Sequence, residues 1–206
     1  MRTQAALREP LAMSLEAVLA DIAACRACAG ELPHAPRPVV MVAPKTRLLI
    51  CGQAPGRKVH ESGAPFTDAS GDRLRDWLGI GYEQFYADPR IGVAAMAFCF
   101  PGTNPKGGDF PPPKRCAELW RPRLLSSLQD VELTLLVGSY AQDWALGDRA
   151  KVSMTETVRA WRDYLPGYLP LPHPSWRNTG WLKRNPWFEA EVVPWLRATV
   201  KRMLPA

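Results

Sequence analysis

Two short stretches, far apart in the chain, carry side chains that can act on a bound ligand. The first is residues 52–56, with the sequence GQAPG, followed by residues 63–66, with the sequence GAPF. The second is residues 173–175, with the sequence HPS. Glycine lets the backbone approach a ligand closely, and histidine changes its charge near neutral pH. Taken alone, each stretch also fits an ordinary turn, but together they indicate a ligand site.

Four of the five cysteines are spaced in a way that suits a four-thiolate site. Cys25 and Cys28 form a CxxC motif, and Cys99 and Cys116 lie at either side of a loop rich in glycine and proline, residues 99–113. Thiolates bind zinc or an iron–sulfur cluster, and the spacing does not choose between them. The alternative is four unrelated reduced thiols. Cys51 belongs to an apolar run and fits a small buried hydrophobic residue.

Alternating strands and helices have to position these groups. The expected strands are residues 47–51, 91–98, 131–137 and 168–171. The expected helices are residues 14–28, a helix from Ser70, residues 114–128, 139–146 and 155–164, and a last helix from Asn185 to about Met203. This alternation predicts a parallel sheet with helices on both faces. The GQAPG loop then follows a central strand at its carboxyl end, where open α/β folds bind ligands.

Capping residues and prolines set the expected helix ends. The expected N-caps are Ser14, Ser70, Ser139 and Asn185, because their side chains can accept a hydrogen bond from a free backbone amide. Proline lacks that amide, so we expect Pro122 to interrupt its helix and Pro194 to kink the last one.

Length and charge narrow the class of protein. The 206 residues fit one domain, residues 1–206, with residues 1–45 as an N-terminal helix and an irregular arm packed on it. The net charge of +6 favours a polyanionic partner. No apolar run is long enough to span a bilayer, and Glu9, Glu16 and Asp21 interrupt any signal-peptide pattern. We therefore expect a cytoplasmic protein with reduced thiols, a monomer without membrane association.

In this order, the motifs resemble the uracil-DNA glycosylase superfamily, and within it the iron–sulfur branch of bacteria and archaea. That branch has a GE(A/G)PG loop, a GxPF segment, an HP(A/S) loop and four cluster cysteines. Residues 52–56, 63–66 and 173–175 match the three motifs, and the similarity extends from about residue 22 to residue 203. The resemblance implies a three-layer α/β/α sandwich with a four-stranded parallel sheet. It also implies a [4Fe–4S] cluster on Cys25, Cys28, Cys99 and Cys116, with zinc or no metal as the alternatives.

The resemblance further implies a DNA base-excision glycosylase, which flips uracil or a related damaged base out of DNA and hydrolyses its N-glycosidic bond. Gln53, with its neighbours Gly52 and Ala54, would line the water and base pocket. Phe66 would stack on the extruded base, and His173 would stabilise the leaving base anion. The residue types suit this chemistry, because a flipped base needs an aromatic face and a departing anion needs hydrogen-bond donors. Outside this context, Phe66 fits a core residue and His173 a loop histidine.

Three positions depart from patterns found in the superfamily. Gln53 stands where the branch has Glu, and Ala54 where the main uracil enzymes have Asp, so neither can act as a general base. His60 or Glu61, just downstream, is then the expected holder of the water, although both also fit a solvated loop. Ala95 stands where the branch reads uracil with Asn, so another residue reads the base or the substrate differs.

Basic and aromatic residues alternate after the HPS loop. The segment continues with Trp176, Arg177 and Asn178, and Ser175 with these three is expected to contact DNA together with Arg57 and Lys58. Phosphate contacts combined with stacking suit single-stranded or distorted DNA. Three alternatives stay open: a catalytically inactive nucleic-acid-binding member of the fold, a glycosidase acting on another damaged base, and an enzyme acting on free nucleosides.

Overall fold

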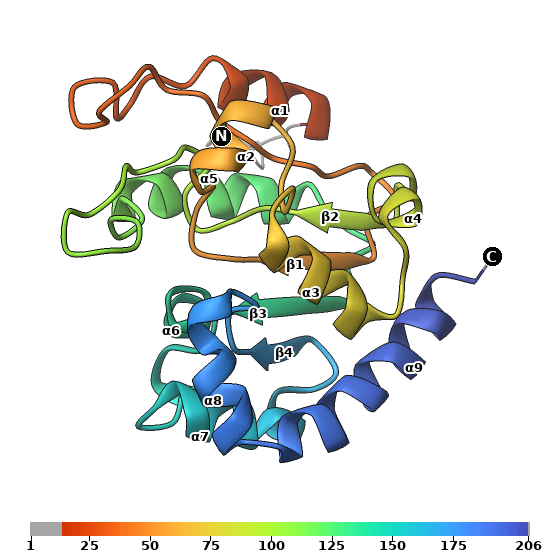
Figure 1. Cartoon of the computed structure of the whole chain (residues 1–206). Helices are drawn as coiled ribbons and strands as arrows, with labels where there is room; N and C mark the ends of the chain where they lie inside the picture. The colour runs from red at the N-terminus through yellow and green to blue at the C-terminus, as the bar shows by residue number, and fades with distance from the viewer. Residues whose placement is uncertain (1–13, 206) are drawn as a thin grey trace, which may run out of the picture.

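A parallel four-stranded sheet forms the centre of the computed structural model, which describes residues 14–205 (Figure 1). The strands are β1 (Leu48–Cys51), β2 (Ile91–Val93), β3 (Leu133–Val137) and β4 (Tyr168–Leu171). Their order is β2-β1-β3-β4, and every neighbouring pair is parallel. The chain thus runs from β1 outward to β2 and then back across to β3. This reversal next to β1 is the point at which such sheets form a crevice at their carboxyl ends.

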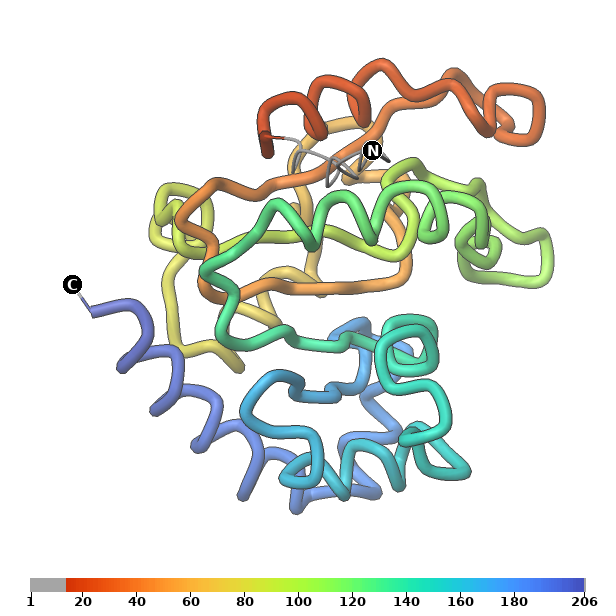
Figure 2. The backbone as a smooth tube through the Cα atoms, turned by 180° about the vertical axis from the view of Figure 1, so that it is seen from behind, coloured from red at the N-terminus to blue at the C-terminus, as the bar shows by residue number. Residues whose placement is uncertain are grey.

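Helices cover both faces of the sheet. The longer ones are α1 (Leu15–Ala23), α3 (Ala69–Leu78), α5 (Lys114–Ser126), α6 (Ser139–Leu146) and α9 (Val193–Met203). The shorter ones are α2 (Arg57–Ser62), α4 (Tyr82–Ala87), α7 (Met154–Arg159) and α8 (Thr179–Arg184). In Figure 1, α3 crosses in front of the sheet, whereas in the reverse view of Figure 2 the green segment that forms α5 crosses in front of it. The expected α/β/α layering is confirmed.

The alternation of side chains along β1 separates the two halves of the core. Leu48 and Ile50 pack on one face, in a cluster that includes Trp77 of α3 and Leu196 of α9. Leu49 packs on the other face with α1 and α5, and Cys51 packs there with α6. All four strand residues are fully buried, as expected for a parallel sheet covered on both faces. The burial of Cys51 confirms its predicted role as a small core residue.

The second strand is shorter than predicted, because β2 ends at Val93 rather than near residue 98. Beyond it the backbone leaves the strand and follows the GQAPG loop, with the Met96 amide bonded to the Gly52 carbonyl at 2.8 Å and the Ala97 amide to the Gln53 carbonyl at 3.1 Å. The apolar residues after β2 are buried all the same, because Ala94 and Phe98 pack with α1 and α5, and Met96 packs with Cys51 and Leu136 of the sheet.

Several helix ends differ from expectation. Ser14 caps α1 as predicted, but α3 is capped by the Asp68 side chain and α6 begins after Gly138 without a side-chain cap. The first helix ends at Ala23, so Cys25 and Cys28 lie in the turns that follow it.

The prolines and the last helices also differ. Pro122 lies on the exposed side of an unbroken α5, where water can satisfy the freed carbonyl. The expected helix over residues 155–164 is instead α7 followed by a 3₁₀ turn, Trp161–Tyr164. Asn185 ends α8 rather than capping the last helix, and a π-helical turn, Phe188–Val192, precedes α9, which has Pro194 in its first turn.

Among the described helices, none is both long and apolar enough to cross a membrane. Glu9, used above in the signal-peptide argument, lies outside the described residues.

Candidate active site at the carboxyl edge of the sheet

A cavity of about 390 Å³ opens at the carboxyl end of β1, and both predicted motif stretches line it. Phe66 from the first stretch and His173 from the second face this same space, although more than a hundred positions separate them in the sequence. The other predicted site residues on its walls are Gly52, Gln53, Ala54, Arg57, Lys58, Ala95, Ser175, Trp176 and Arg177. The cavity therefore collects most of the residues singled out in the sequence.

Phe66 is held in an unusual backbone conformation. Its φ is 56°, a region that bulky residues rarely adopt. Its carbonyl accepts hydrogen bonds from Arg75 at 3.0 Å and from the Tyr86 hydroxyl at 3.1 Å. Gly71 makes this possible, because a Cβ at that position would lie 1.8 Å from the Phe66 oxygen. The edge of the ring in turn lies 4.0 Å from the place of a Cβ on Gly52, so the ring lies beside the GQAPG loop.

One hydrogen bond fixes the tautomer of His173. The Ser175 amide donates to its Nδ1 at 3.1 Å, so Nδ1 carries no proton and the neutral ring carries its proton on Nε2. Burial lowers the pKa of His173 below its usual 6.5, an effect that the Asp68 carboxylate opposes and Arg177 reinforces. The site thus presents a neutral histidine with a donor nitrogen available to a ligand.

Arg73 joins the two motif stretches. From α3, its guanidinium donates to the carbonyls of Pro174 at 3.2 Å and Ser175 at 3.0 Å, and to the Thr179 hydroxyl at 3.4 Å. Because α3 begins at Ala69, three residues after Phe66, these bonds set the position of the HPS loop relative to the aromatic ring.

The long loop, residues 99–113, forms another wall of the site. Gln53 donates from Nε2 to the Phe110 carbonyl at 3.1 Å, and Arg57 donates to the Thr103 hydroxyl at 3.4 Å. Asp109 lines the cavity, with Oδ2 3.5 Å from the place of a Cβ on Gly56. Asp109 was not singled out from the sequence, in which this loop separates Cys99 from Cys116.

Two acidic side chains on the cavity walls, Asp68 and Asp109, were not predicted. Asp68 Oδ1 accepts from the amides of Ser70 and Gly71 and from the Ser70 hydroxyl, so this oxygen is committed to capping α3. The pKa of Asp109 is raised above its usual value, chiefly by burial; Arg177 and Arg57 lower it and Asp68 raises it further. Asp109 as a whole residue is exposed, so the burial effect belongs to its carboxylate end, which lies against Gly56. No local sequence pattern identifies either residue as part of the site, because the place of each depends on loop packing.

The position expected to read the base is apolar, as the sequence indicates. Ala95 is half-buried on the cavity wall. Among the described residues that line the cavity, the side chain with an amide group is that of Gln53. Behind Ala95, the buried Arg121 donates to the carbonyls of Ala94 at 3.0 Å and Ala95 at 3.3 Å. The backbone at this wall is therefore fixed by a buried cation, while the side chain offers no hydrogen bond.

The mouth of the cavity is basic and aromatic. Arg57 and Lys58 border it from α2, and Trp176 is 71% exposed. The Arg177 guanidinium lies 5.2 Å from the centre of the Trp176 ring. A large exposed aromatic surface beside a guanidinium suits stacking against nucleobases and contact with phosphates.

Three residues predicted for catalysis or DNA contact lie outside the cavity. The His60 ring packs on His34, with ring centres 4.0 Å apart, because α2 directs Val59 and not His60 toward the site. Glu61 is exposed, and its contact with Arg37 is made by its backbone carbonyl, which accepts a hydrogen bond from the guanidinium. The prediction that one of them holds the water is therefore wrong for this structure.

Asn178 is the third. Its side-chain amide donates to the His173 carbonyl at 2.7 Å, so it braces the HPS loop rather than lining the mouth of the cavity. Of the nearby tryptophans, Trp181 is buried and donates to the Thr155 hydroxyl, which anchors α8.

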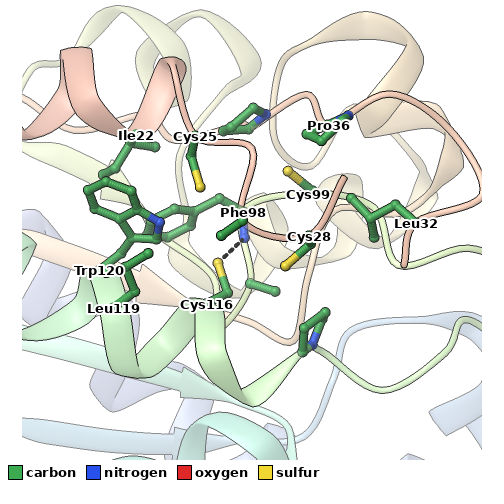
Figure 3. A pocket seen from close by; sticks show the side chains of 14 residues that line it. Ile22, Cys25, Cys28, Leu32, Pro36, Phe98, Cys99, Cys116, Leu119 and Trp120 are labelled. Atoms are coloured by element: carbon green, nitrogen blue, oxygen red, sulfur yellow. Dashed lines mark hydrogen bonds between the residues drawn. The ribbon is translucent and has the colours of Figure 1, made fainter. Parts of the chain in front are cut away.

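The four predicted cysteine ligands surround a second, narrow cavity of about 20 Å³ (Figure 3). Cys25 and Cys28 come from the turns after α1, Cys99 from the long loop and Cys116 from the first turn of α5. Apolar side chains, including Ile22, Phe98 and Trp120, shield them. The pKa values of Cys99 and Cys116 are raised to about 11, chiefly by burial and to a smaller extent by the neighbouring thiols.

This donor set fits a thiolate-bound metal group in its chemistry, since four sulfur atoms converge on one apolar cavity. Within residues 14–205, however, no group of three or more His, Cys, Asp or Glu side chains is arranged so that it could hold a metal ion as it stands. Binding would therefore require the thiols or their loops to adjust.

The fold and the cavity define an α/β protein with a ligand site at the carboxyl edge of a parallel sheet. A sequence model of the uracil DNA glycosylase superfamily matches residues 40–197. Since this match covers most of the chain, the protein belongs to the uracil-DNA glycosylase superfamily. The match includes both motif stretches, Cys99 and Cys116, whereas Cys25 and Cys28 precede it. Membership suggests a glycosylase-like function.

Proposed function

We propose that the protein is a DNA glycosylase, which hydrolyses the N-glycosidic bond of uracil or a related damaged base after the nucleotide has flipped into the 390 Å³ cavity. The observation that carries this proposal is the convergence of Phe66 and His173 on that one cavity. A flipped base needs a stacking partner and hydrogen-bond donors to its edge, and these two residues supply both.

Phe66 and His173 have distinct roles in the proposed reaction. The Phe66 ring replaces the stacking that the base loses when it leaves the duplex. The His173 Nε2–H group donates to an oxygen of the base as negative charge develops on it in the transition state. A neutral donor suits this role at neutral pH, and the lowered pKa of His173 keeps the ring in that form.

The basic mouth of the cavity supports DNA as the substrate. Arg57, Lys58 and Arg177 supply positive charge next to the pocket, and Trp176 supplies an exposed ring for stacking. Phosphate contacts of this kind make affinity depend strongly on salt. The combination favours single-stranded or distorted DNA, in which bases are open to stacking.

The identity of the base is the least constrained part of the proposal. Ala95 offers no amide to a pyrimidine edge, and a site without that partner discriminates less strongly between bases. Uracil is the first substrate to test, and hypoxanthine, xanthine and hydroxymethyluracil are the alternatives.

We also propose that Cys25, Cys28, Cys99 and Cys116 hold a [4Fe–4S] cluster, with zinc or no metal as the alternatives. The support is their common cavity and its apolar shield. Such a group would act structurally, by tying the N-terminal arm to the long loop that forms a wall of the base pocket. Reduced thiols are consistent with a cytoplasmic protein, and we expect it to act as a monomer.

A base-release assay tests the proposed activity. Oligonucleotides that carry each of the four bases, single- and double-stranded, are incubated with the protein and then cleaved with alkali at abasic sites. We expect release of at least one base, and a loss of about 100- to 1,000-fold for His173→Ala, as for removal of one donor to a developing anion. The control is His60→Gln, because His60 lies outside the cavity; it is expected to keep wild-type activity.

The outcomes separate the competing functions. Tight binding of DNA without any strand cleavage, unchanged by His173→Ala, would identify a binding protein that has lost catalysis. Release of base from free nucleosides that competitor DNA does not inhibit would identify a nucleoside hydrolase. Thermal melting of each variant confirms that a lost activity does not reflect a lost fold.

A further inference from the structure

The carboxylate of Asp109 is the unexplained group of the candidate site. It lines the cavity, and one of its oxygens lies 3.5 Å from the place of a Cβ on Gly56. Among the residues that the structure describes, no ion pair or side-chain hydrogen bond engages it. The second acid of the cavity, Asp68, commits its Oδ1 to capping α3. Within the described part of the chain, Asp109 therefore has both carboxylate oxygens free to accept hydrogen bonds from a ligand, whereas Asp68 has one.

The long loop holds Asp109 in a defined place. Residues 103 and 109 form an antiparallel bridge, and Gly107 and Gly108 make the intervening turn with φ values of 100° and 80°. On the far side, the Phe110 carbonyl accepts from Gln53. The loop is therefore bonded to the GQAPG motif directly after Asp109, through Gln53, and to α2 at Thr103, through Arg57. Its turn needs the two glycines because other residues rarely adopt positive φ.

The charges around Asp109 come from three separate elements. Arg57 faces it from α2, Arg177 from the segment after the HPS loop, and Asp68 from the start of α3. The two arginines also border the mouth of the cavity, where DNA phosphates would lie, so in a DNA complex they would bind phosphates rather than Asp109. A carboxylate in these surroundings suits a reaction that develops positive charge on a sugar.

We propose that Asp109 is a catalytic residue, which binds the attacking water and accepts its proton. This inference rests on the proposed glycosylase function. In the reaction, the oxygen of water forms a bond to C1′ while the C1′–N bond breaks. The electron pair of that bond leaves with the base as an anion, which His173 stabilises. The proton of the water passes to the Asp109 carboxylate and from there to solvent, so the net change is hydrolysis.

This assignment accounts for the departures in the first motif. Gln53 and Ala54 supply no carboxylate where related proteins have one, and His60 and Glu61 lie outside the cavity. The acid comes instead from a loop about fifty residues further along the chain, brought to the motif by the Gln53–Phe110 hydrogen bond.

Single-turnover base release at saturating enzyme, measured as a function of pH, tests the role. Asp109→Asn is expected to reduce the rate by about 100- to 10,000-fold, the range for loss of a general base. Wild type should lose activity as the pH falls through the pKa of Asp109, because only the ionised form accepts a proton. This acid limb should be absent from the residual activity of Asp109→Asn and retained in Asp109→Glu. Asp130→Asn, at the opposite edge of the sheet before β3, is the control and is expected to match wild type.

Each result has a defined meaning. If wild type is active and Asp109→Asn has the same rate and the same pH profile, the role of Asp109 is refuted while the glycosylase function stands. A variant that only weakens DNA binding, with an unchanged rate at saturation, refutes it equally. If wild type releases no base at all, the proposed function fails and the role of Asp109 fails with it. If Asp109→Asn does not fold, the acid limb of Asp109→Glu decides: its presence supports the proposal and its absence overturns it.

Discussion

At the scale of single residues, the aromatic wall of the site depends on a glycine that does not line it. Gly71 lies inside α3, where glycine is normally unfavourable, yet its missing Cβ leaves room for the Phe66 carbonyl. That carbonyl, held by Arg75 and Tyr86, fixes Phe66 in its positive-φ conformation. Strain of this kind persists only where the surroundings enforce it, and it is common at functional sites.

Gly71→Ala tests this dependence. The added methyl would lie 1.8 Å from the Phe66 oxygen, so the loop or the helix has to move. We expect a loss of about 1–3 kcal/mol in the free energy of unfolding, as for other overpacked sites, together with weaker base release. Urea denaturation and the base-release assay measure the two effects. Gly167→Ala is the control, since no atom lies within 4 Å of its added Cβ, and equal stability of both variants would contradict the argument.

At the scale of elements, the site depends on α3 because this helix contacts both motif stretches. It begins three residues after Phe66, and its Arg73 binds two carbonyls of the HPS loop. The GQAPG loop leaves the sheet at the carboxyl end of β1, and the HPS loop leaves it at the carboxyl end of β4. The strands alone therefore hold neither loop in place. Arg73 is therefore a positioning residue, which sets the distance between the aromatic ring and the histidine without touching the ligand.

Arg73→Met is expected to reduce kcat/KM for base release by about 10- to 100-fold, equivalent to about 1.5–3 kcal/mol for lost hydrogen bonds to a charged group. The effect should fall mainly on kcat, because the variant misplaces His173 rather than the phosphate contacts. Faster amide hydrogen exchange in residues 172–179 would accompany it. Arg202→Met serves for comparison, since Arg202 bonds only within α9, to Thr199, among the contacts described. Normal kcat with unchanged exchange in Arg73→Met would show that the HPS loop positions itself.

At the scale of the whole molecule, the cysteine cavity and the base cavity share one structural element. The loop of residues 99–113 carries Cys99 at its start and Asp109 near its end, and α5 with Cys116 follows directly. The N-terminal arm completes the thiol set from the other side and binds α2 through Arg37, whose guanidinium donates to the carbonyls of His60 and Glu61. Order in the thiol site therefore favours order in two walls of the base site.

Anaerobic purification tests the proposed cluster. We expect a brown protein with visible absorption, and loss of both colour and thermal stability in Cys25→Ser and Cys116→Ser. Cys51→Ala should keep the colour, because Cys51 is buried in the sheet away from the other thiols. A colourless protein with one zinc per chain would replace iron–sulfur by zinc, and a metal-free protein with five titratable thiols would remove the site altogether.

Sequence reasoning succeeded where a residue's role follows from its local pattern. The apolar run that ends at Gly138 predicted β3 within two residues, and the alternation of elements predicted the parallel sheet. The convergence of Phe66 and His173 was also predicted correctly, because loops that follow parallel strands emerge at one edge. Motif order and the rules of parallel connection thus determine the site at the level of loops.

The errors arose where position depends on orientation within an unpredicted short helix or on loop docking. His60 was expected in the site, but α2 turns it toward His34 and presents Val59 to the cavity instead. Asp109 was overlooked because a residue in a long Gly/Pro loop has no periodicity that fixes its direction.

The sequence by itself determined the family, the parallel sheet and the two loops that form the site, because apolar periodicity and motif order are local properties of the chain. Only the tertiary structure decided which acids face the ligand space, and it decided between one shared cavity and four unrelated thiols for the cysteines. These arrangements depend on how long loops pack on one another, through contacts such as Gln53 with Phe110.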